Sequence, residues 1–155
     1  MGANPKKMKK IKLTQGKYAL VDDQDFKFIN QWKWCFDNRY AHRKEGVKKI
    51  YMHRLIMNTP NDLTLDHINR DRRDNRKTNL RNCTRSENQK NLPKFINGTS
   101  QYKGIHKQGK YWRTRIRVNG KKIHGGYFVD EVSAAKKYNE LAIKYHGRFA
   151  NINNL

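Results

Sequence analysis

The chain has 155 residues, with 35 Lys and Arg against 13 Asp and Glu, and a formal net charge of +22. This length accommodates one ordinary domain or two very small ones. Since 35% of the residues are hydrophobic and 11% are aromatic, we expect small, solvated units with aromatic-rich cores. We expect neither a transmembrane helix, which needs a run of about 18 or more apolar residues, nor a secretory signal, whose apolar stretch does not follow the first lysines.

The positive charge is spread along the whole chain. Residues 1–98 carry 23 Lys and Arg against 10 Asp and Glu, and residues 99–155 carry 12 against 3. Basic side chains that meet phosphates release counterions. The composition therefore favours a nucleic acid partner over an acidic membrane, for which a long basic amphipathic segment is missing.

Two cysteines, Cys35 and Cys83, lie 48 residues apart and form no Cys-x-x-Cys pair. We therefore expect neither a disulfide framework nor a structural zinc site. An intracellular, reduced protein is the expectation.

Residues 1–12 carry five lysines, and we expect either a flexible solvated tail or an arm that contacts a nucleic acid backbone. A strand is predicted over residues 17–21, with Tyr18 and Leu20 on one face. The two aspartates that follow predict a turn. Apolar residues then recur at helical spacing between positions 26 and 32.

Hairpin strands are predicted at residues 34–36 and 40–42, and residues 50–51 can add a further strand. A short helix with apolar residues on one face is expected over residues 52–56, ending before Pro60. These elements predict an α+β scaffold for the N-terminal half.

Residues 65–68 and 80–83 predict two short strands, and the stretch between them is too polar to be buried. Thr84 and Glu87 have the spacing of a capping box, so a helix is expected to start at Thr84 with Asn88 in its first turn. The pattern is therefore strand, loop, strand and helix.

This segment holds the residue types that phosphodiester hydrolysis needs, a cation site and a base that activates water. Asp66 is an oxygen ligand for a hard ion such as Mg²⁺, and a neutral imidazole makes His67 a base near pH 7. Adjacent strand residues point to opposite sides, so His67 can reach water while Asp66 reaches the metal. Asn88 can add an oxygen ligand, and Asn79 can hydrogen bond across the loop.

The segment resembles the HNH (ββα-metal) nucleases, especially the phage and intron homing endonucleases in which the last His is replaced by Asn. The resemblance rests on M-H-R-L-I-M, L-D-H-I-N, N-L-R-N-C-T and S-E-N, with 12 residues from His67 to Asn79 and 9 from Asn79 to Asn88. It implies His67 as general base and Asp66 and Asn88 as ligands of Mg²⁺ or Mn²⁺ rather than zinc. It also implies Asn79 as the residue that braces the loop, with Asn75 as a rival. 

A further histidine, His53, precedes this motif, and two interpretations of it stay open. It faces the active site, or it is an ordinary packed helix histidine. We assign it no role from the sequence.

Residues 90–101 contain Pro, Gly and small polar residues and are predicted to be a linker. Strands are then predicted at residues 102–106, 112–118 and 122–128, with an Asn-Gly hairpin turn between the last two. A helix with apolar residues at three- or four-residue steps is predicted from residue 130 to 146.

The middle strand of this part separates apolar from basic side chains. Alternation places Trp112, Thr114, Ile116 and Val118 on one face and three arginines on the other. The helix is expected to cover the apolar face. The arginines are then free to meet DNA, because a β-ribbon fits the major groove and Arg pairs with guanine edges; the alternative is that they are merely solvated.

This part resembles the plant ethylene-response-factor (Apetala-type) DNA-binding domain over nearly all of residues 100–154. The resemblance rests on S-x-Y-K-G-I, K-Y-W-R-T-R-I-R, G-G-Y-F, S-A-A-K-K-Y-N and H-G-R-F-A-N-I-N, and such domains also occur in HNH homing endonucleases. Arg115 stands where the plant pattern usually has Glu, so the plant target sequence is not carried over. The DNA-facing residues implied are Lys103, His106, Arg113, Arg115, Arg117 and Lys122.

We therefore predict an α+β protein with an HNH nuclease domain over residues 1–89, its ββα-metal motif at about residues 63–91, and a linker over residues 90–101. A DNA-binding domain follows over residues 102–155, a three-stranded antiparallel sheet packed on one helix. The predicted function is a sequence-recognising, divalent-metal-dependent DNA endonuclease, and the HNH resemblance implies hydrolysis that leaves a 3′-hydroxyl and a 5′-phosphate.

The alternatives are a non-catalytic DNA-binding regulator, an inactive nuclease relative and a non-specific nuclease. The expected partner is double-stranded DNA, cut by nicking or by a double-strand break and bound by a monomer or weak dimer. No membrane and no other protein is required. We expect an intracellular protein of a bacterial host, encoded by a phage.

Overall fold

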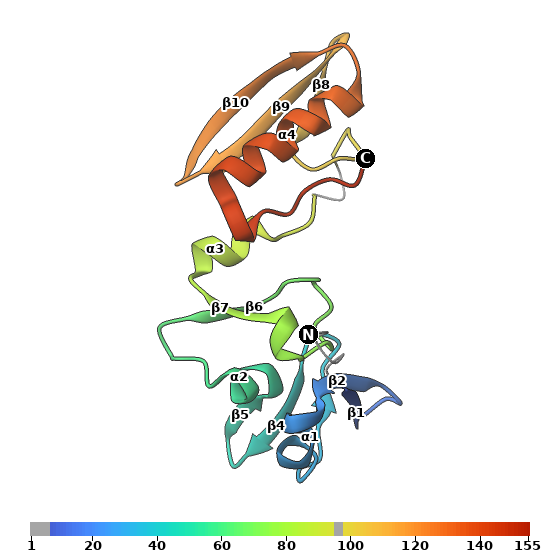
Figure 1. Cartoon of the computed structure of the whole chain (residues 1–155), viewed down its shortest axis with the longest axis vertical. Coiled ribbons are helices and arrows are strands. Elements are labelled where there is room, and N and C mark those ends of the chain that lie inside the picture. Colours follow the sequence, from blue (N-terminus) through green and yellow to red (C-terminus); the bar gives the residue numbers. More distant parts are fainter. Residues whose placement is uncertain (1–6, 95–97) are drawn as a thin grey trace, which may run out of the picture. The chain divides into compact units, whose positions relative to one another are not determined.

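A computed structural model describes residues 7–94 and 98–155 (Figure 1). Residues 1–6 of the predicted arm and residues 95–97 of the predicted linker lie outside the described residues. The chain forms two compact units, Met1–Arg85 and Ser86–Leu155. Small antiparallel sheets and helices build them, so the predicted α+β class is confirmed. None of the described helices has the length and apolar character to cross a membrane.

The first unit begins with a hairpin where a free basic arm was expected. β1 (Met8–Lys12) pairs antiparallel with β2 (Tyr18–Asp22), so the flexible-tail form of the arm prediction is wrong for this strand, and contact with a nucleic acid backbone stays a prediction. Ile11 and Leu13 are 1% and 3% exposed. Burial of these two apolar side chains stabilises the strand although lysines surround them.

The buried face of β2 is the opposite of the predicted one. Ala19 and Val21 lie in the core, whereas Tyr18 is exposed and Leu20 is half-buried. The two aspartates predicted to form a turn lead into α1 (Asp23–Ile29) instead. Acidic residues in a first helical turn interact favourably with the helix dipole.

The next elements follow the prediction. β3 (Cys35–Phe36), β4 (Ala41–Glu45) and β5 (Lys48–Tyr51) form a three-stranded antiparallel sheet in the order β3-β4-β5. α2 (Met52–Met57) ends at Asn58, whose backbone is left-handed with φ 44°.

The predicted strand–loop–strand–helix segment is formed by β6 (Thr64–His67), β7 (Leu80–Cys83) and α3 (Arg85–Lys90). A short 3-10 helix, η1 (Lys77–Asn79), leads into β7. β6 and β7 pair antiparallel. The start of this helix was predicted at Thr84, and α3 begins one residue later, at Arg85.

One cluster of buried side chains joins these elements of the first unit. Trp34 is 2% exposed, and its indole Nε1 donates a hydrogen bond of 2.9 Å to the carbonyl oxygen of Ile29. The cluster also contains Ile11, Val21, Met52, Leu65 and Leu80. The β6–β7 hairpin therefore packs on the N-terminal hairpin and on α2 through a shared core.

The second unit has the predicted three strands and helix. β8 (Ile105–Gln108), β9 (Tyr111–Val118) and β10 (Lys121–Phe128) form an antiparallel sheet in the order β10-β9-β8. α4 (Glu131–His146) packs on one face of it (Figure 1), followed by the short 3-10 helix η2 (Gly147–Phe149). 

The apolar face of β9 is the covered one, as predicted. Thr114 is fully buried, and its hydroxyl donates to the carbonyl oxygen of Ala134 at 2.8 Å. Ile116 packs in the same cluster as Tyr138.

The stretch predicted as a linker contributes buried residues to the second unit. Asn91 and Ser100 are 6% and 5% exposed. The carbonyl oxygen of Ser100 accepts from Nζ of Lys94 at 3.1 Å, and its hydroxyl hydrogen bonds to Glu131. These described residues are therefore part of a packed unit.

Candidate active site

The hairpin of β6 and β7 carries Asp66 and His67 next to each other, each 5% exposed. In the antiparallel register Asp66 lies opposite Arg81 and His67 lies opposite Leu80. Neighbouring strand residues project to opposite sides, so the two side chains have different surroundings. 

His67 is held by Asn75. Its Nε2 lies 3.0 Å from Oδ1 of Asn75, which is 1% exposed. Asn75 donates its backbone N–H to the carbonyl of Leu20 at 2.8 Å, and its side-chain amide to the carbonyl of Arg73 and the sulfur of Met52. Since an amide oxygen only accepts, this contact places the ring proton on Nε2 and the lone pair of the neutral ring on Nδ1.

The loop that follows β6 is polar and yet partly buried, so the expectation that it is too polar to be buried is wrong. Asp74 and Asn75 are 3% and 1% exposed. Asp74 accepts from Nε and Nη2 of Arg76, both at 2.7 Å, and from Nδ2 of Asn69 at 2.9 Å. The Arg76 contact lowers the pKa of Asp74. Polar groups with partners can be buried at little cost.

Asn79 joins the two ends of this loop. Its Oδ1 accepts from the backbone N–H of Asn69 at 2.9 Å, and its Nδ2 donates to the carbonyl of Asp74 at 2.8 Å. Its own carbonyl accepts from the N–H of Ile68 at 2.8 Å. Asn79 and its rival Asn75 thus have separate contacts, Asn79 to the loop backbone and Asn75 to His67.

His53 lies on α2 in the wall around His67. The two ring centroids are 5.3 Å apart in an edge-on arrangement, and the rings of Tyr40 and Tyr51 lie 4.8 and 5.6 Å from His53. Its Nδ1 is buried without a hydrogen-bond partner among the described residues. Burial, assisted by His67, lowers the pKa of His53 to about 3, so this ring is neutral.

His67 has a lowered pKa for the same main reason. Burial lowers it, while the hydrogen bond to Asn75 and the charge of Asp66 oppose the shift. A lowered pKa keeps the imidazole neutral near pH 7, which is the state that accepts a proton.

Asp66 has a cationic partner on the facing strand. Arg81 donates to Oδ2 of Asp66 from Nε at 2.8 Å and also from Nη2. Over residues 7–94 and 98–155, no three His, Cys, Asp or Glu gather to hold a metal ion. A cation at Asp66 would therefore take most of its ligands from amide, water and phosphate oxygens, as Mg²⁺ does in sites of few carboxylates.

The second predicted ligand, Asn88, lies half-buried on α3. It falls in the second unit, whereas Asp66 is in the first. That both bind one ion stays a prediction.

The N-terminal hairpin contacts the loop that holds Asn75. Leu20 donates its N–H to the carbonyl of Arg73 at 2.8 Å. Oδ2 of Asp22 accepts from the N–H of Lys77 at 2.8 Å, and Nζ of Lys77 pairs with Asp25 at 2.7 Å. Asp22 and Lys77 are 55 residues apart in the sequence, and no local pattern predicts such pairing.

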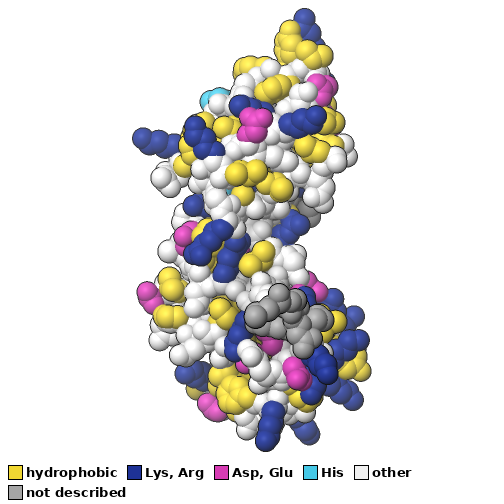
Figure 2. All heavy atoms as spheres, in the orientation of Figure 1, with side chains coloured by type: hydrophobic (Ala, Val, Ile, Leu, Met, Phe, Trp, Pro, Cys, Tyr) yellow, Lys and Arg dark blue, Asp and Glu magenta, His cyan; other side chains and the backbone are white. Residues whose placement is uncertain are grey.

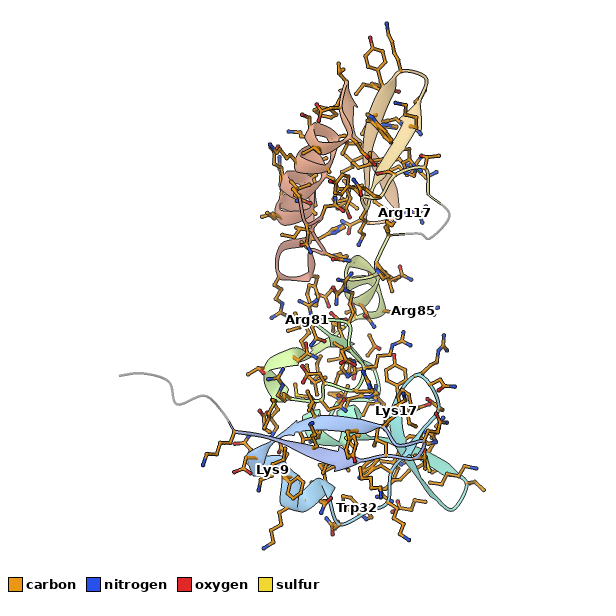
Figure 3. All side chains as sticks on the ribbon, turned by 90° about the vertical axis from the view of Figure 1, so that its right-hand side faces the viewer. Lys9, Lys17, Trp32, Arg81, Arg85 and Arg117 are labelled. Atoms are coloured by element: carbon orange, nitrogen blue, oxygen red, sulfur yellow. The ribbon has the colours of Figure 1, made fainter. Side chains whose placement is uncertain are left out.

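The second unit presents basic and aromatic side chains on the sheet face opposite α4. Cross-strand pairing arranges them in three rows, His106–Arg113–Tyr127, Arg115–His124 and Arg117–Lys122 (Figure 3 labels Arg117). The sequence analysis missed His124 and Tyr127. A bulge between His124 and Gly126 shifts the register of β10, and the Gly-Gly pair was the available signal for it.

Lys103 has contacts different from those of a DNA-facing side chain. Its Nζ donates to the carbonyl oxygens of Lys90 and Leu92, at 2.8 and 2.5 Å, and the residue is half-buried. Carbonyls at a helix C-terminus are common partners for a lysine. We therefore leave Lys103 out of the proposed DNA surface.

Comparison with known proteins gives a family match over part of the chain and a relative over most of it. Residues 51–90 match the HNH endonuclease family. A protein of Acanthamoeba polyphaga mimivirus, named an uncharacterized HNH endonuclease, is 25% identical over 143 residues, which cover 88% of this chain and 74% of the relative. No solved structure matches the chain. The family match ends at residue 90, and these findings do not support the Apetala-type resemblance of the C-terminal part.

Proposed function

From the HNH endonuclease domain at residues 51–90, we propose that this chain is a sequence-recognising DNA endonuclease of the homing type that depends on a divalent metal ion. The observation that carries the proposal is the buried pair of Asp66 and His67 on β6, with Nε2 of His67 held by Asn75. It hydrolyses phosphodiester bonds, leaving a 3′-hydroxyl and a 5′-phosphate.

His67 is the general base. Because Nε2 donates to Asn75, Nδ1 takes the proton of the attacking water, and burial keeps the ring neutral and ready for it. Asn79 holds the ends of the loop together, so that Asn75 stays in place behind His67.

Asp66 and Asn88 would hold the cation, with Mg²⁺ the favoured ion and Mn²⁺ a substitute. When bound, the ion supplies positive charge that stabilises the charge developing on the phosphate and on the leaving oxygen. The fit rests on oxygen donors: a buried carboxylate and a half-buried amide.

The second unit would select the DNA. The face of its three-stranded sheet opposite α4 carries five of the six residues that the sequence analysis inferred as DNA contacts. The proposed DNA contacts are His106, Arg113, Arg115, Arg117 and Lys122, with His124 and Tyr127 added. Because each chain has one site, a monomer nicks a single strand. A double-strand break requires a weak dimer or two successive binding events.

The test is conversion of supercoiled plasmid carrying DNA of the source genome to nicked or linear forms, with Mg²⁺ or with EDTA. Wild-type protein should cut only with Mg²⁺. His67→Ala should cut at least about 100-fold more slowly, the usual contribution of a general base, with unchanged DNA affinity. Asp66→Asn should be inactive, while the matched control Asp62→Asn, an exposed aspartate just before β6, should cut normally.

Cleavage by His67→Ala at the wild-type rate would overturn the base assignment. Tight, salt-sensitive DNA binding without cleavage on any source DNA would favour a non-catalytic regulator or an inactive relative. A cleavage map without preferred sites would favour a non-specific nuclease.

A further inference from the structure

A hollow of about 280 Å³ lies on the first unit between the β1–β2 hairpin and the loop after β6. We call it the basic hollow and define it by six of its lining residues, Lys10, Lys17, Tyr18, Leu20, Asp71 and Arg73. In Figure 2, Lys and Arg side chains gather over the region of this hairpin.

The charge of the basic hollow is only partly compensated, because one carboxylate faces three cations. Asp71 supplies its one carboxylate, and this group already accepts from the backbone N–H of Arg73 at 3.0 Å and lies 3.5 Å from Nε of the same residue. Within the described part of the chain, Lys10 and Lys17 form no ion pair. Three cations and one carboxylate leave the hollow with a net positive charge, which favours binding of a further anion.

The described lysines on the two faces of the β1–β2 hairpin differ in their ion pairs. Lys9 lies on the other face of β1, where Nζ pairs with Asp23 at 2.8 Å and lies 4.8 Å from the ring centre of Phe26. Lys10 lies opposite Leu20 on the face of the hollow, and Lys17 lies at the turn. Figure 3 shows Lys9 and Lys17 towards opposite ends of this hairpin.

The basic hollow is connected to the general base by three hydrogen bonds. The N–H of Leu20 donates to the carbonyl of Arg73, the N–H of Asn75 donates to the carbonyl of Leu20, and Oδ1 of Asn75 contacts Nε2 of His67. Two lining residues are therefore direct neighbours of the residue that holds His67. An anion bound here lies at a fixed place relative to the catalytic side chain.

We propose that the basic hollow binds a backbone phosphate of the DNA substrate, with Lys10, Lys17 and Arg73 as its ligands. This inference rests on the proposed function for the identity of the substrate. It adds a DNA contact in the nuclease unit that is separate from the arginine face of the second unit. Its role is to hold the strand at the nuclease site, and it carries no base specificity because phosphates are the same at every position.

The experiment measures binding of the full chain to a DNA duplex in EDTA, as a function of salt, so that it does not depend on cleavage. The test variant is Lys10→Gln/Lys17→Gln. The matched control is Lys9→Gln/Lys27→Gln, two exposed lysines on β1 and α1, the first neutralised by Asp23. The test variant should reduce the magnitude of the slope of log affinity against log salt by about 0.9, the contribution of the one phosphate bound in the hollow, and should weaken binding at least roughly tenfold.

The slope of the control variant should differ from the wild-type slope by less than about half the contribution of one phosphate contact. Melting curves of both variants should match that of the wild type. Equal losses in test and control variants, or an unchanged slope in the test variant, would overturn the proposal. A protein that cuts no DNA but shows the expected slope change would refute the nuclease and leave the phosphate site standing. Binding of free inorganic phosphate by wild type, with unchanged DNA slopes, would assign the hollow to a free anion instead.

Discussion

Asp66, the proposed metal ligand, lies directly opposite Arg81 in the β6–β7 pairing and is bound by it through two guanidinium nitrogens. The two side chains are 6% and 13% exposed. A cation that binds Asp66 must therefore share the carboxylate with Arg81 or displace it. This pairing gives the buried carboxylate an ionic partner and holds it in place before any ion binds, because an unpaired buried charge is costly.

Replacing Arg81 should make the protein more dependent on Mg²⁺. Arg81→Gln leaves Asp66 without its guanidinium and should cost roughly 3 kcal/mol in the free energy of unfolding measured in EDTA. Mg²⁺ should then raise the melting temperature of Arg81→Gln more than that of the wild type, because the ion binds the folded state alone and replaces the lost charge.

The matched control is Arg76→Gln, which breaks the comparable contact with Asp74. Mg²⁺ should not restore its stability, because Asp74 is not a proposed ligand. Equal Mg²⁺ effects on the wild type, Arg81→Gln and Arg76→Gln would argue against Asp66 as a metal ligand.

Asn75 should act on catalysis through His67. Asn75→Leu removes the acceptor of the Nε2 proton and should lower kcat by about 10- to 100-fold with little change in KM, since a displaced base slows the chemical step. It should also lower stability by about 1–3 kcal/mol, the cost of a buried group without a partner.

The conservative variant Asn75→Asp keeps an acceptor oxygen and should recover most of kcat. Nitrogen chemical shifts of His67 provide a direct readout, with the proton on Nε2 in the wild type and in Asn75→Asp. Loss of stability in Asn75→Leu with normal kcat would reduce Asn75 to a structural residue.

His53 should make the first unit sensitive to acid. An unfolded histidine takes up a proton near its ordinary pKa of 6.5, whereas His53 in the folded protein has a pKa of about 3. The unfolded state therefore binds more protons throughout this window, and stability falls as the pH drops from 6.5 towards 3. The loss from this group should reach about 2 kcal/mol at pH 5.

His53→Gln should flatten this pH dependence in unfolding experiments between pH 7 and 5. His124→Gln, which changes an exposed histidine of the second unit, should keep the wild-type profile. The same steep profile in both variants would place the acid sensitivity elsewhere.

Arg115 should contribute to sequence selection. It is in the middle row of the free sheet face, beside His124 and 3.5 Å from Nε2 of His106. Arg115→Ala should cost about 1–3 kcal/mol of affinity on the preferred site and less on other DNA, if it contacts a base. A small, equal loss on every sequence would make it a phosphate contact.

Lys103→Ala is the contrasting variant for this experiment. Its ammonium group holds the carbonyls of Lys90 and Leu92, so the change should lower stability and leave the preference between DNA sequences as it is. Competition binding with two duplexes measures both effects.

The sequence by itself determined the elements whose patterns are local. Alternation along β9 separates the arginines from Thr114 and Ile116, and the buried side confirmed that assignment. The local pattern also predicted the strands β6 and β7 around Asp66 and His67, which pair as a hairpin. Neighbouring residues on a strand must point to opposite faces, so spacing alone decides which side chains share a side.

Only the tertiary structure decided which polar and basic groups are buried or paired. β1 looked like a free lysine tail until pairing with β2 gave Ile11 a core to enter. Asn75 looked like an exposed loop residue until contacts with Leu20 and His67 satisfied it. Burial of a polar group depends on hydrogen-bond partners that are distant in the chain, and these partners exist only once the chain has folded.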